Sequence, residues 1–252
     1  MNNYTILDCI KMFGKIETNG RLSDTINYEE FMNMLSTVEV KDYTEKTSGY
    51  TDIGHIILGK VIEKITNKDI NEYYKESIFN KYNMPNTMFN PSKEYKLLGN
   101  GNSLYLPHDF KTRTAKGMTG AAGLFGNIKD LTTFSKELYN YNIFDKEFIN
   151  EIYNYNFVDV RNRNRSYSGL YKYTNEYNCY VPKEFSKYSL AHQGFTGALI
   201  VSDLHNKFTQ VMLFNALKDG AKVKHPDFLK GFYEFQKRIN EYSILLYLIS
   251  TK

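Results

Sequence analysis

The segment from Ile53 to Ile65 constrains the fold most, because its apolar residues recur with the period of an amphipathic helix. Thr51 or Asp52 can cap the first turn of this helix. A helix with one apolar face buries that face against another layer of structure. The sequence therefore predicts a packed helix here more clearly than anywhere else. Its apolar positions are Ile53, Ile56, Ile57, Val61, Ile62 and Ile65.

Five other segments carry weaker helical patterns. Short helices are expected within residues 3–17 and 27–35, and longer ones at about 69–82 and after a cap near Asn127. A long amphipathic helix is expected at the C-terminus, lying across a sheet with its apolar stripe in the core. That stripe consists of Phe228, Phe232, Phe235, Ile239, Tyr242 and Leu246.

Strand patterns are concentrated late in the chain. Residues 198–203 and 207–214 have the composition of two strands and are joined by a short turn, which predicts a hairpin. Residues 38–40 are also strand-like. Residues 86–119 contain several turn signals and are expected to form a long surface loop. Residues 140–187 are polar and aromatic and carry no clear pattern.

The order of these elements predicts one α/β (α+β) domain that spans residues 1–252. No internal repeat or flexible linker divides the chain, so a sheet layer and a helical layer are expected to share one structure. The helical part is expected at about 50–140. The sheet hairpin and the C-terminal helix are expected at about 188–252.

Composition argues against several classes of partner and location. The 32 basic and 28 acidic side chains give a net charge of +4 that is spread along the sequence, so nucleic acid is not an expected partner. No stretch approaches the roughly 20 apolar residues of a membrane span. Cys9 and Cys179 match no zinc spacing and are interpreted as free thiols. No export signal is recognisable at the start, which favours a cytoplasmic location for the chain as written.

No cofactor and no metal are predicted. His108 and Asp109 lack a third ligand at a suitable spacing. The sequence contains no Gly-x-Ser-x-Gly elbow, no Walker phosphate loop and no Rossmann glycine fingerprint. Nothing in the sequence indicates an oligomeric state.

Two short motifs suggest a catalytic site, although each also has a structural interpretation. Tyr50 could act as a general acid or base if a nearby cation lowered its pKa from about 10. Alternatively, Tyr-x-Asp is a chance match in a chain with 22 tyrosines, and Asp52 only caps a helix. Gly194, two residues after His192, would let a ligand approach a strand backbone, but a lone histidine beside a strand is more often structural.

Four motifs follow one another along the chain. Tyr50-Thr-Asp-Ile-Gly comes first, followed by Tyr82-Asn-Met-Pro, Gly120-Ala-Ala-Gly-Leu-Phe-Gly126 and His192-Gln-Gly-Phe-Thr-Gly197. In this order they resemble the serine β-lactamase-related hydrolases, a family that groups class C β-lactamases, penicillin-binding proteins and esterases. The resemblance covers most of residues 3–215. It implies a β-lactamase/transpeptidase-like fold, with an antiparallel sheet flanked by helices and a helical subdomain.

The same resemblance implies roles for five residues. Tyr50 takes the place of a tyrosine that transfers protons, and Asp52 replaces the usual asparagine of that motif. His192 would face the substrate carboxylate or carbonyl group. Gly194 and Phe195 follow it in the strand motif, and the backbone N–H of Phe195 would belong to the oxyanion hole. The expected partner is a small-molecule or peptide ligand.

The nucleophile that these motifs serve is missing from the sequence. Such proteins carry a serine with a lysine three residues later, and the 252 residues contain no Ser-x-x-Lys. Asp8–Lys11 lacks a hydroxyl group at its first position, and the threonine of Thr133–Lys136 belongs to a separate predicted helix. The opening segment Tyr4–Lys11 resembles a family segment that follows the nucleophile helix. We therefore expect the chain to be truncated at its N-terminus, with an incomplete sheet.

Three interpretations of function remain open at this point. The first is a β-lactamase-related serine hydrolase that acts through an acyl-enzyme on an ester, amide or D-alanyl peptide and is inactive as given. The second is a non-catalytic binding protein for a cell-wall peptide or a protein partner. The third is a genetic remnant with no selected activity.

Overall fold

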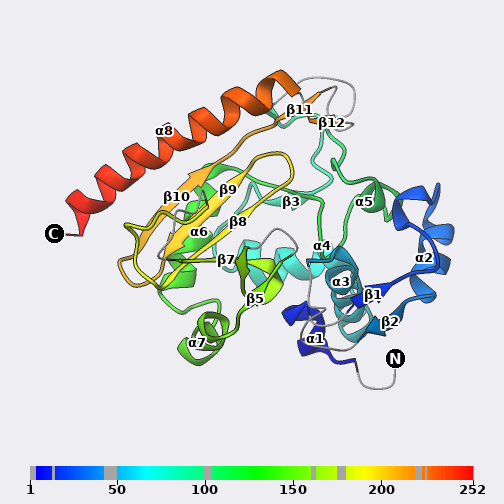
Figure 1. Ribbon diagram of the computed structural model, residues 1–252. Coiled ribbons are helices and arrows are strands. Elements are labelled where there is room, and N and C mark those ends of the chain that lie inside the picture. The colour runs from blue at the N-terminus through cyan, green and yellow to red at the C-terminus, as the bar shows by residue number, and fades with distance from the viewer. Residues whose placement is uncertain are drawn as a thin grey trace.

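An antiparallel sheet lies between the long C-terminal helix α8 and a group of helices formed by earlier parts of the chain (Figure 1). The computed structural model describes residues 4–12, 15–42, 50–98, 104–159, 163–174, 180–218, 223–224 and 226–251. This arrangement confirms the predicted fold class, in which helices flank an antiparallel sheet.

Six strands form this sheet in the order β10-β9-β8-β7-β6-β5, and each neighbouring pair is antiparallel. Their bounds are β5 (Phe157–Val158), β6 (Asn164–Arg165), β7 (Tyr171–Lys172), β8 (Ser189–Gln193), β9 (Leu199–Asp203) and β10 (Phe208–Met212). The predicted hairpin is confirmed as β9 and β10, in which Phe208 pairs with Asp203 and Met212 with Leu199.

Three two-stranded pairs lie outside this sheet. They are β1 (Lys15–Glu17) with β2 (Glu39–Asp42), β3 (Met88–Phe89) with β4 (Leu124–Phe125), and β11 (Leu217–Lys218) with β12 (Val223–Lys224).

Helices α1 to α7 begin at side chains that accept hydrogen bonds from free backbone N–H groups. Thr51 caps α3 and Asn127 caps α6, as the sequence predicts. The helix bounds are α1 (Ile6–Lys11), α2 (Tyr28–Ser36), α3 (Asp52–Thr66), α4 (Ile70–Tyr74), α5 (Phe110–Thr114), α6 (Ile128–Tyr139), α7 (Lys146–Asn154) and α8 (Pro226–Ser250). A π-helical turn (Lys75–Asn80) extends α4, and short 3-10 turns occupy Leu22–Asp24 and Tyr167–Gly169.

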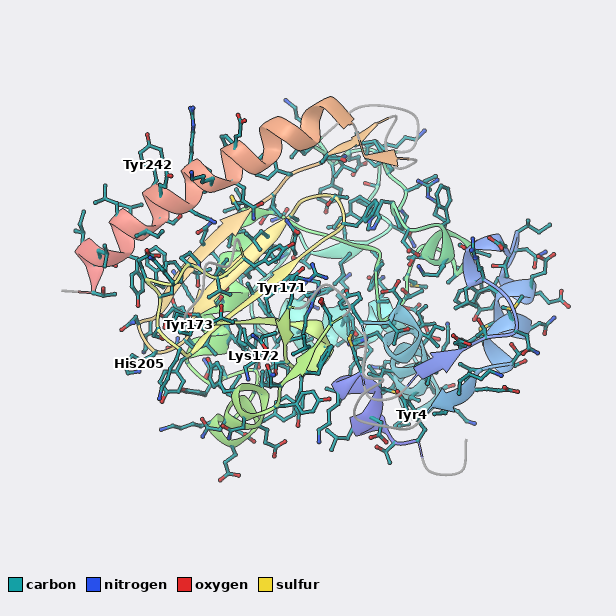
Figure 2. All side chains as sticks on the ribbon, in the orientation of Figure 1. Tyr4, Tyr171, Lys172, Tyr173, His205 and Tyr242 are labelled. Atoms are coloured by element: carbon teal, nitrogen blue, oxygen red, sulfur yellow. The ribbon has the colours of Figure 1, made fainter. Side chains whose placement is uncertain are left out.

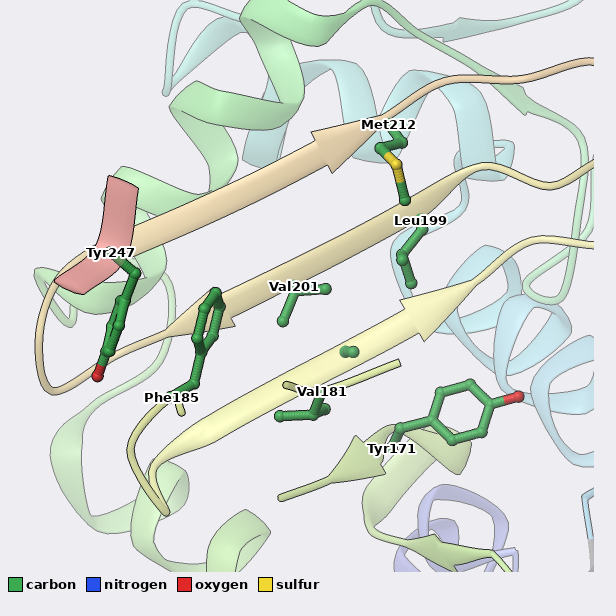
Figure 3. Close-up of a cluster of buried hydrophobic side chains, with 8 residues drawn as sticks. Tyr171, Val181, Phe185, Leu199, Val201, Met212 and Tyr247 are labelled. Atoms are coloured by element: carbon green, nitrogen blue, oxygen red, sulfur yellow. The ribbon is translucent and has the colours of Figure 1, made fainter. Parts of the chain in front are cut away.

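One face of the sheet packs against α8. Side chains alternate along a strand, so Leu199 and Val201 of β9 point to this face together with Ala191 of β8. Phe185 and Tyr247 close the cluster at one end, where their rings stack with centroids 4.5 Å apart (Figure 3). The core therefore joins the sheet to the last turns of α8.

The opposite face of the sheet meets the helical part of the protein. Leu190 of β8 packs there against Ile149 and Ile152 of α7. Ser202 of β9 makes a hydrogen bond of 2.9 Å with Ser135 of α6. Because side chains in a strand alternate, His192 lies on the same face as Leu190 and is directed toward the helices.

The structure differs from the sequence analysis in three places. The short helix expected within residues 3–17 is α1, and strand β1, which was not predicted, follows it. The stretch 140–187 contains α7 and strands β5 to β7, which have no counterpart in the sequence pattern. In α8, Tyr242 is 68% exposed and lies on the outer side of the helix (Figure 2), whereas the neighbouring Tyr247 is the buried anchor.

Leu246 is exposed as well, so the predicted apolar stripe does not face the core at these positions. The face of α8 that contacts the sheet is partly polar, because Asn240 accepts a hydrogen bond of 2.9 Å from Gln210 of β10.

Among the described residues, no helix is long and apolar enough to cross a membrane.

Candidate active site

Tyr50 lies just before α3, at the point where the helical part faces the sheet. The Thr51 side chain accepts a hydrogen bond from the N–H of Ile53 and so fixes the start of the helix. The Tyr50 ring rests on Gly169, where a Cβ atom would lie 2.4 Å from the Tyr50 Cδ2 atom. Gly169 has a φ of +69°, so glycine is favoured there for two independent reasons.

The pKa of Tyr50 is raised above its ordinary value of 10.0. Partial desolvation is the main cause, although 46% of the residue is exposed, and the negative charge of Asp52 adds to it. The positive charges of Arg165 and Lys111 act in the opposite direction. Tyr50 therefore carries its proton at neutral pH and can donate it in a reaction.

Asp52 belongs to a chain of charged residues beside Tyr50. Its carboxylate lies 3.0 Å from the Nζ atom of Lys111, which is also 2.8 Å from the carboxylate of Asp109. Although burial alone would lower the pKa of Lys111, the hydrogen bond to Asp109 and the charge of Asp52 raise it. Lys111 is therefore a fixed cation that connects α5 to the first turn of α3.

His192 supplies a neutral imidazole to the same region. Burial lowers its pKa to about 4, and the positive charges of Arg165 and His55 contribute to the shift. At neutral pH the side chain can accept or donate a hydrogen bond without carrying charge. It is therefore suited to contact a carbonyl group more than to form an ion pair with a carboxylate.

Gly194 and Phe195 form the turn after β8. The N–H of Gly194 donates to the carbonyl oxygen of Ala198 at 2.8 Å, which closes the turn. A Cβ atom at Gly194 would meet no atom closer than 3.8 Å, so no internal contact requires glycine there. The exposed Phe195 ring stacks on His108, with ring centroids 5.2 Å apart and an angle of 8° between the planes.

These contacts connect the two predicted motifs across the fold. Phe195 stacks on His108, the next residue Asp109 binds Lys111, and Lys111 binds Asp52. A cavity of about 520 Å³ opens beside this chain of contacts, between the segment 17–23 and the first turn of α3. The tyrosine motif and the strand motif are therefore parts of one region.

Three residues in this region were missed by the sequence analysis. Lys111 and Arg165 are basic residues without a motif around them, and only the fold brings them to Tyr50. His55 lies one helical turn after Asp52, and its buried Nε2 atom has no hydrogen-bond partner among the described residues. The spacing of Asp52 and His55 on one helix face is the only sequence signal that could have indicated one of them.

No substitute for the missing serine and lysine pair is found in the segments considered above. The hydroxyl group of Thr133 donates to the carbonyl oxygen of Lys129 within α6. The carboxylate of Asp8 forms a capping box with Thr5. Burial raises the pKa of the free thiol of Cys9 to about 11, so this group is not a thiolate at neutral pH. Cys179 lies outside the described residues.

The sequence profile of the Beta-lactamase family matches residues 14–230. The chain therefore belongs to this family of hydrolases, as the order of its motifs predicts. A protein of Escherichia coli (strain K12) that carries the name of a D-alanyl-D-alanine carboxypeptidase is 26% identical over 213 residues. That match covers 73% of this chain and 48% of the relative, so the chain spans about half the length of the protein it resembles.

Solved structures agree on the fold. The D-amino acid amidase from Ochrobactrum anthropi in complex with L-phenylalanine superposes with a TM-score of 0.64 at 15% identity, covering 96% of this chain and 70% of that chain. FmtA from Staphylococcus aureus superposes with a TM-score of 0.58 at 18% identity, covering 98% of this chain and 62% of that chain. At these identities the likeness establishes the fold alone.

Proposed function

We propose that the region around Tyr50 is the substrate site of a serine hydrolase that acts through an acyl-enzyme on an ester, amide or D-alanyl peptide. Tyr50 would transfer protons, and Asp52 would hold Lys111 beside it. His192 and the backbone N–H of Phe195 would contact the substrate carbonyl group. Support comes from the contacts that connect Phe195, His108, Asp109, Lys111 and Asp52, because they join two motifs that are about 140 residues apart in sequence.

The 252-residue chain itself is proposed not to complete this reaction. Acyl-enzyme formation requires an activated nucleophile, and the sequence contains no Ser-x-x-Lys. Loss of a nucleophile lowers kcat by about six orders of magnitude in well-studied serine hydrolases. The site would therefore bind ligands and turn them over poorly or not at all.

A second candidate function is binding without catalysis. It is favoured by the room for added atoms at Gly194, where a Cβ atom would make only ordinary contacts of 3.8 Å or more, together with the neutral state of His192. A cell-wall peptide that ends in D-alanine is the ligand class we propose for both candidates. Because the 252-residue chain contains no Ser-x-x-Lys, both candidates predict that it binds this ligand and turns it over poorly or not at all.

The substitution Gly194→Val tests whether the site binds such a ligand. A Cβ atom at position 194 would have no contact closer than 3.8 Å, and the larger valine side chain is chosen to occupy the place that a ligand would need beside the strand. We expect the thermal midpoint of the free protein to stay within about 2 °C of the wild type. An N-acylated D-alanyl-D-alanine peptide is expected to raise that midpoint for the wild type and not for the variant.

Gly194→Ala provides the graded control, and its ligand response should lie between the two. Equal stabilisation of all three proteins would mean that the peptide binds elsewhere. No stabilisation of the wild type would contradict both candidate functions. Hydrolysis of the peptide with release of D-alanine would contradict the proposal that the 252-residue chain cannot complete the reaction.

A further inference from the structure

Arg165 of β6 is held rigidly next to the candidate site. Its side chain is only 5% exposed, and its Nε atom donates to the carboxylate of Asp159 at 2.9 Å. Its Nη1 atom donates to the carbonyl oxygen of Gly169. A guanidinium bound on two sides has little freedom to rotate, so its position relative to its neighbours is fixed.

The same guanidinium lies against two aromatic rings. Its central carbon is 3.8 Å from the ring centroid of Tyr171 and 5.0 Å from that of Tyr50. Tyr171 belongs to β7 and lies where the sheet meets the helical part (Figure 2). Both distances are within the range of attractive contacts between a cation and an aromatic ring.

Gly169 provides a second, indirect link between Arg165 and Tyr50, because both side chains contact it. Arg165 binds its carbonyl oxygen, while the Tyr50 ring rests on its Cα side, where no Cβ atom could be accommodated. Any movement of the turn Tyr167–Gly169 would therefore change both contacts of Tyr50. Arg165 limits that movement.

We propose that Arg165 is the positioning residue of this site, which fixes the Tyr50 ring against Gly169 and places a permanent positive charge beside it. The inference rests on the proposed function, in which Tyr50 transfers a proton. In this proposal Tyr50 is oriented by a residue that lies outside the motifs recognised in the sequence.

The balance of charge around Tyr50 supports this role. Arg163 and Arg165 share the single carboxylate of Asp159, so that cluster keeps a net charge of +1. Lys111 binds two carboxylates, Asp52 and Asp109, and that cluster has a net charge of −1.

Tyr50 therefore lies between a positive and a negative cluster, and among the described residues Tyr171 is a further titratable neighbour. Lys111 is held between two carboxylates, so Arg165, whose guanidinium lies directly over the Tyr50 ring, is the cation whose proximity favours ionisation of Tyr50.

The test measures the ionisation of Tyr50 directly and does not depend on activity. Tetranitromethane modifies the phenolate form of tyrosine, and peptide mapping by mass spectrometry assigns each nitrated residue. Exposed Tyr242 serves as an internal standard within each sample. Arg165→Gln keeps hydrogen-bond donors but removes the charge, and Arg165→Lys keeps the charge.

We expect Arg165→Gln to slow nitration of Tyr50 about tenfold at pH 8 relative to Tyr242, which corresponds to about one pKa unit. Arg165→Lys should recover most of the rate. Arg163→Gln is the matched control: it removes one positive charge from the same Asp159 cluster, but the Arg163 guanidinium lies over the Tyr171 ring, 5.3 Å from its centroid, and not over the ring of Tyr50. Its rate should stay within about twofold of the wild type. An unchanged rate in Arg165→Gln, or an equal decrease in Arg163→Gln, would overturn the proposal.

A second measurement avoids substitution of the arginine. In the variant Tyr50→Ala, the NMR signal of the Arg165 Nε–H group should shift because the ring current of Tyr50 is removed, while that of Arg163 stays in place. The absence of a shift at Arg165 would contradict the contact. If the protein binds no peptide but both results hold, only the proposed function fails.

Discussion

Replacing Gly120 with alanine is expected to lower the free energy of unfolding by about 3 kcal/mol, because two backbones meet there without room for a side chain. A Cβ atom at Gly120 would lie 2.0 Å from the carbonyl oxygen of His55 and 3.1 Å from the backbone nitrogen of Gly59. Both partners belong to the backbone of α3, so the contact cannot be relieved by a side-chain rotation. The helix has to move as a unit, together with Tyr50 and Asp52 at its start.

Gly126→Ala is the matched control within the same glycine-rich motif. Its Cβ atom would lie 3.4 Å from the Oγ1 atom of Thr87, which is close to an ordinary contact. We expect a change of less than about 1 kcal/mol for this control. Urea unfolding monitored by circular dichroism measures both variants. A Gly120→Ala protein as stable as the control would show that α3 and this motif are not in close contact.

The substitution Asp203→Ala is expected to destabilise the protein by about 4 kcal/mol at pH 7, because it removes a buried acceptor shared by several donors. Asp203 is fully buried at the end of β9. Its carboxylate accepts hydrogen bonds from the N–H and hydroxyl groups of Ser186 at 2.8 and 2.7 Å. It also accepts from the hydroxyl group of Tyr247 at 2.8 Å and from the turn residues His205 and Asn206.

The loss of stability caused by Asp203→Ala should depend on pH. Although burial alone would raise the pKa of Asp203, hydrogen bonds from Ser186, Asn206 and Tyr247 hold it below the ordinary value of 3.8. A folded-state pKa below the unfolded value contributes stability that is present above about pH 4 and is lost as the pH falls through the folded value. The difference in stability between wild type and Asp203→Ala should therefore be smaller at pH 3 than at pH 7.

Asp145→Ala provides the comparison for an exposed carboxylate. Asp145 caps α7 by accepting one hydrogen bond from the N–H of Phe148, so its loss should cost about 1 kcal/mol. Urea denaturation of the three proteins at pH 7 and pH 3 measures these differences. An effect of Asp203→Ala no larger than that of Asp145→Ala would contradict the central place of Asp203 in joining α8 to the sheet.

The parts of the fold that were predicted from sequence have local causes. The start of α3 is determined by Thr51 and by the apolar period that follows it, and the β9–β10 hairpin by two runs of strand-forming residues. Strands β5 to β7 are two residues long each, which is too short for a period to be recognised. They form because β8 offers a partner, and that pairing is not local.

The interpretation of α8 failed for a related reason. Spacing alone indicates which residues share a helix face, but the surface opposite decides which face is buried. Gln210 of β10 meets Asn240, and the pocket around Phe185 and Phe208 accepts Tyr247. Both contacts involve residues outside α8, so the sequence of α8 alone does not predict them. Spacing therefore could not distinguish the exposed residues Tyr242 and Leu246 from the buried Tyr247.

The candidate site shows the same division between local and non-local causes. Tyr50, Asp52 and His192 were predicted as site residues because short motifs surround them in the sequence. Arg165 is one of several basic residues in a run without periodicity, and the register of β6 with β7 brings it to Tyr50 and Tyr171. Because the partners of Arg165 come from three different segments, the sequence around Arg165 does not indicate its role.

Intact-mass analysis of the folded 252-residue protein tests the central claim most directly. The protein would be incubated separately with a fluorophosphonate and with a penicillin, both of which acylate or phosphonylate an activated serine. We expect binding without covalent reaction, so the mass should stay that of the unmodified 29.5 kDa chain. A stoichiometric adduct would show that another serine acts as nucleophile and would contradict the account.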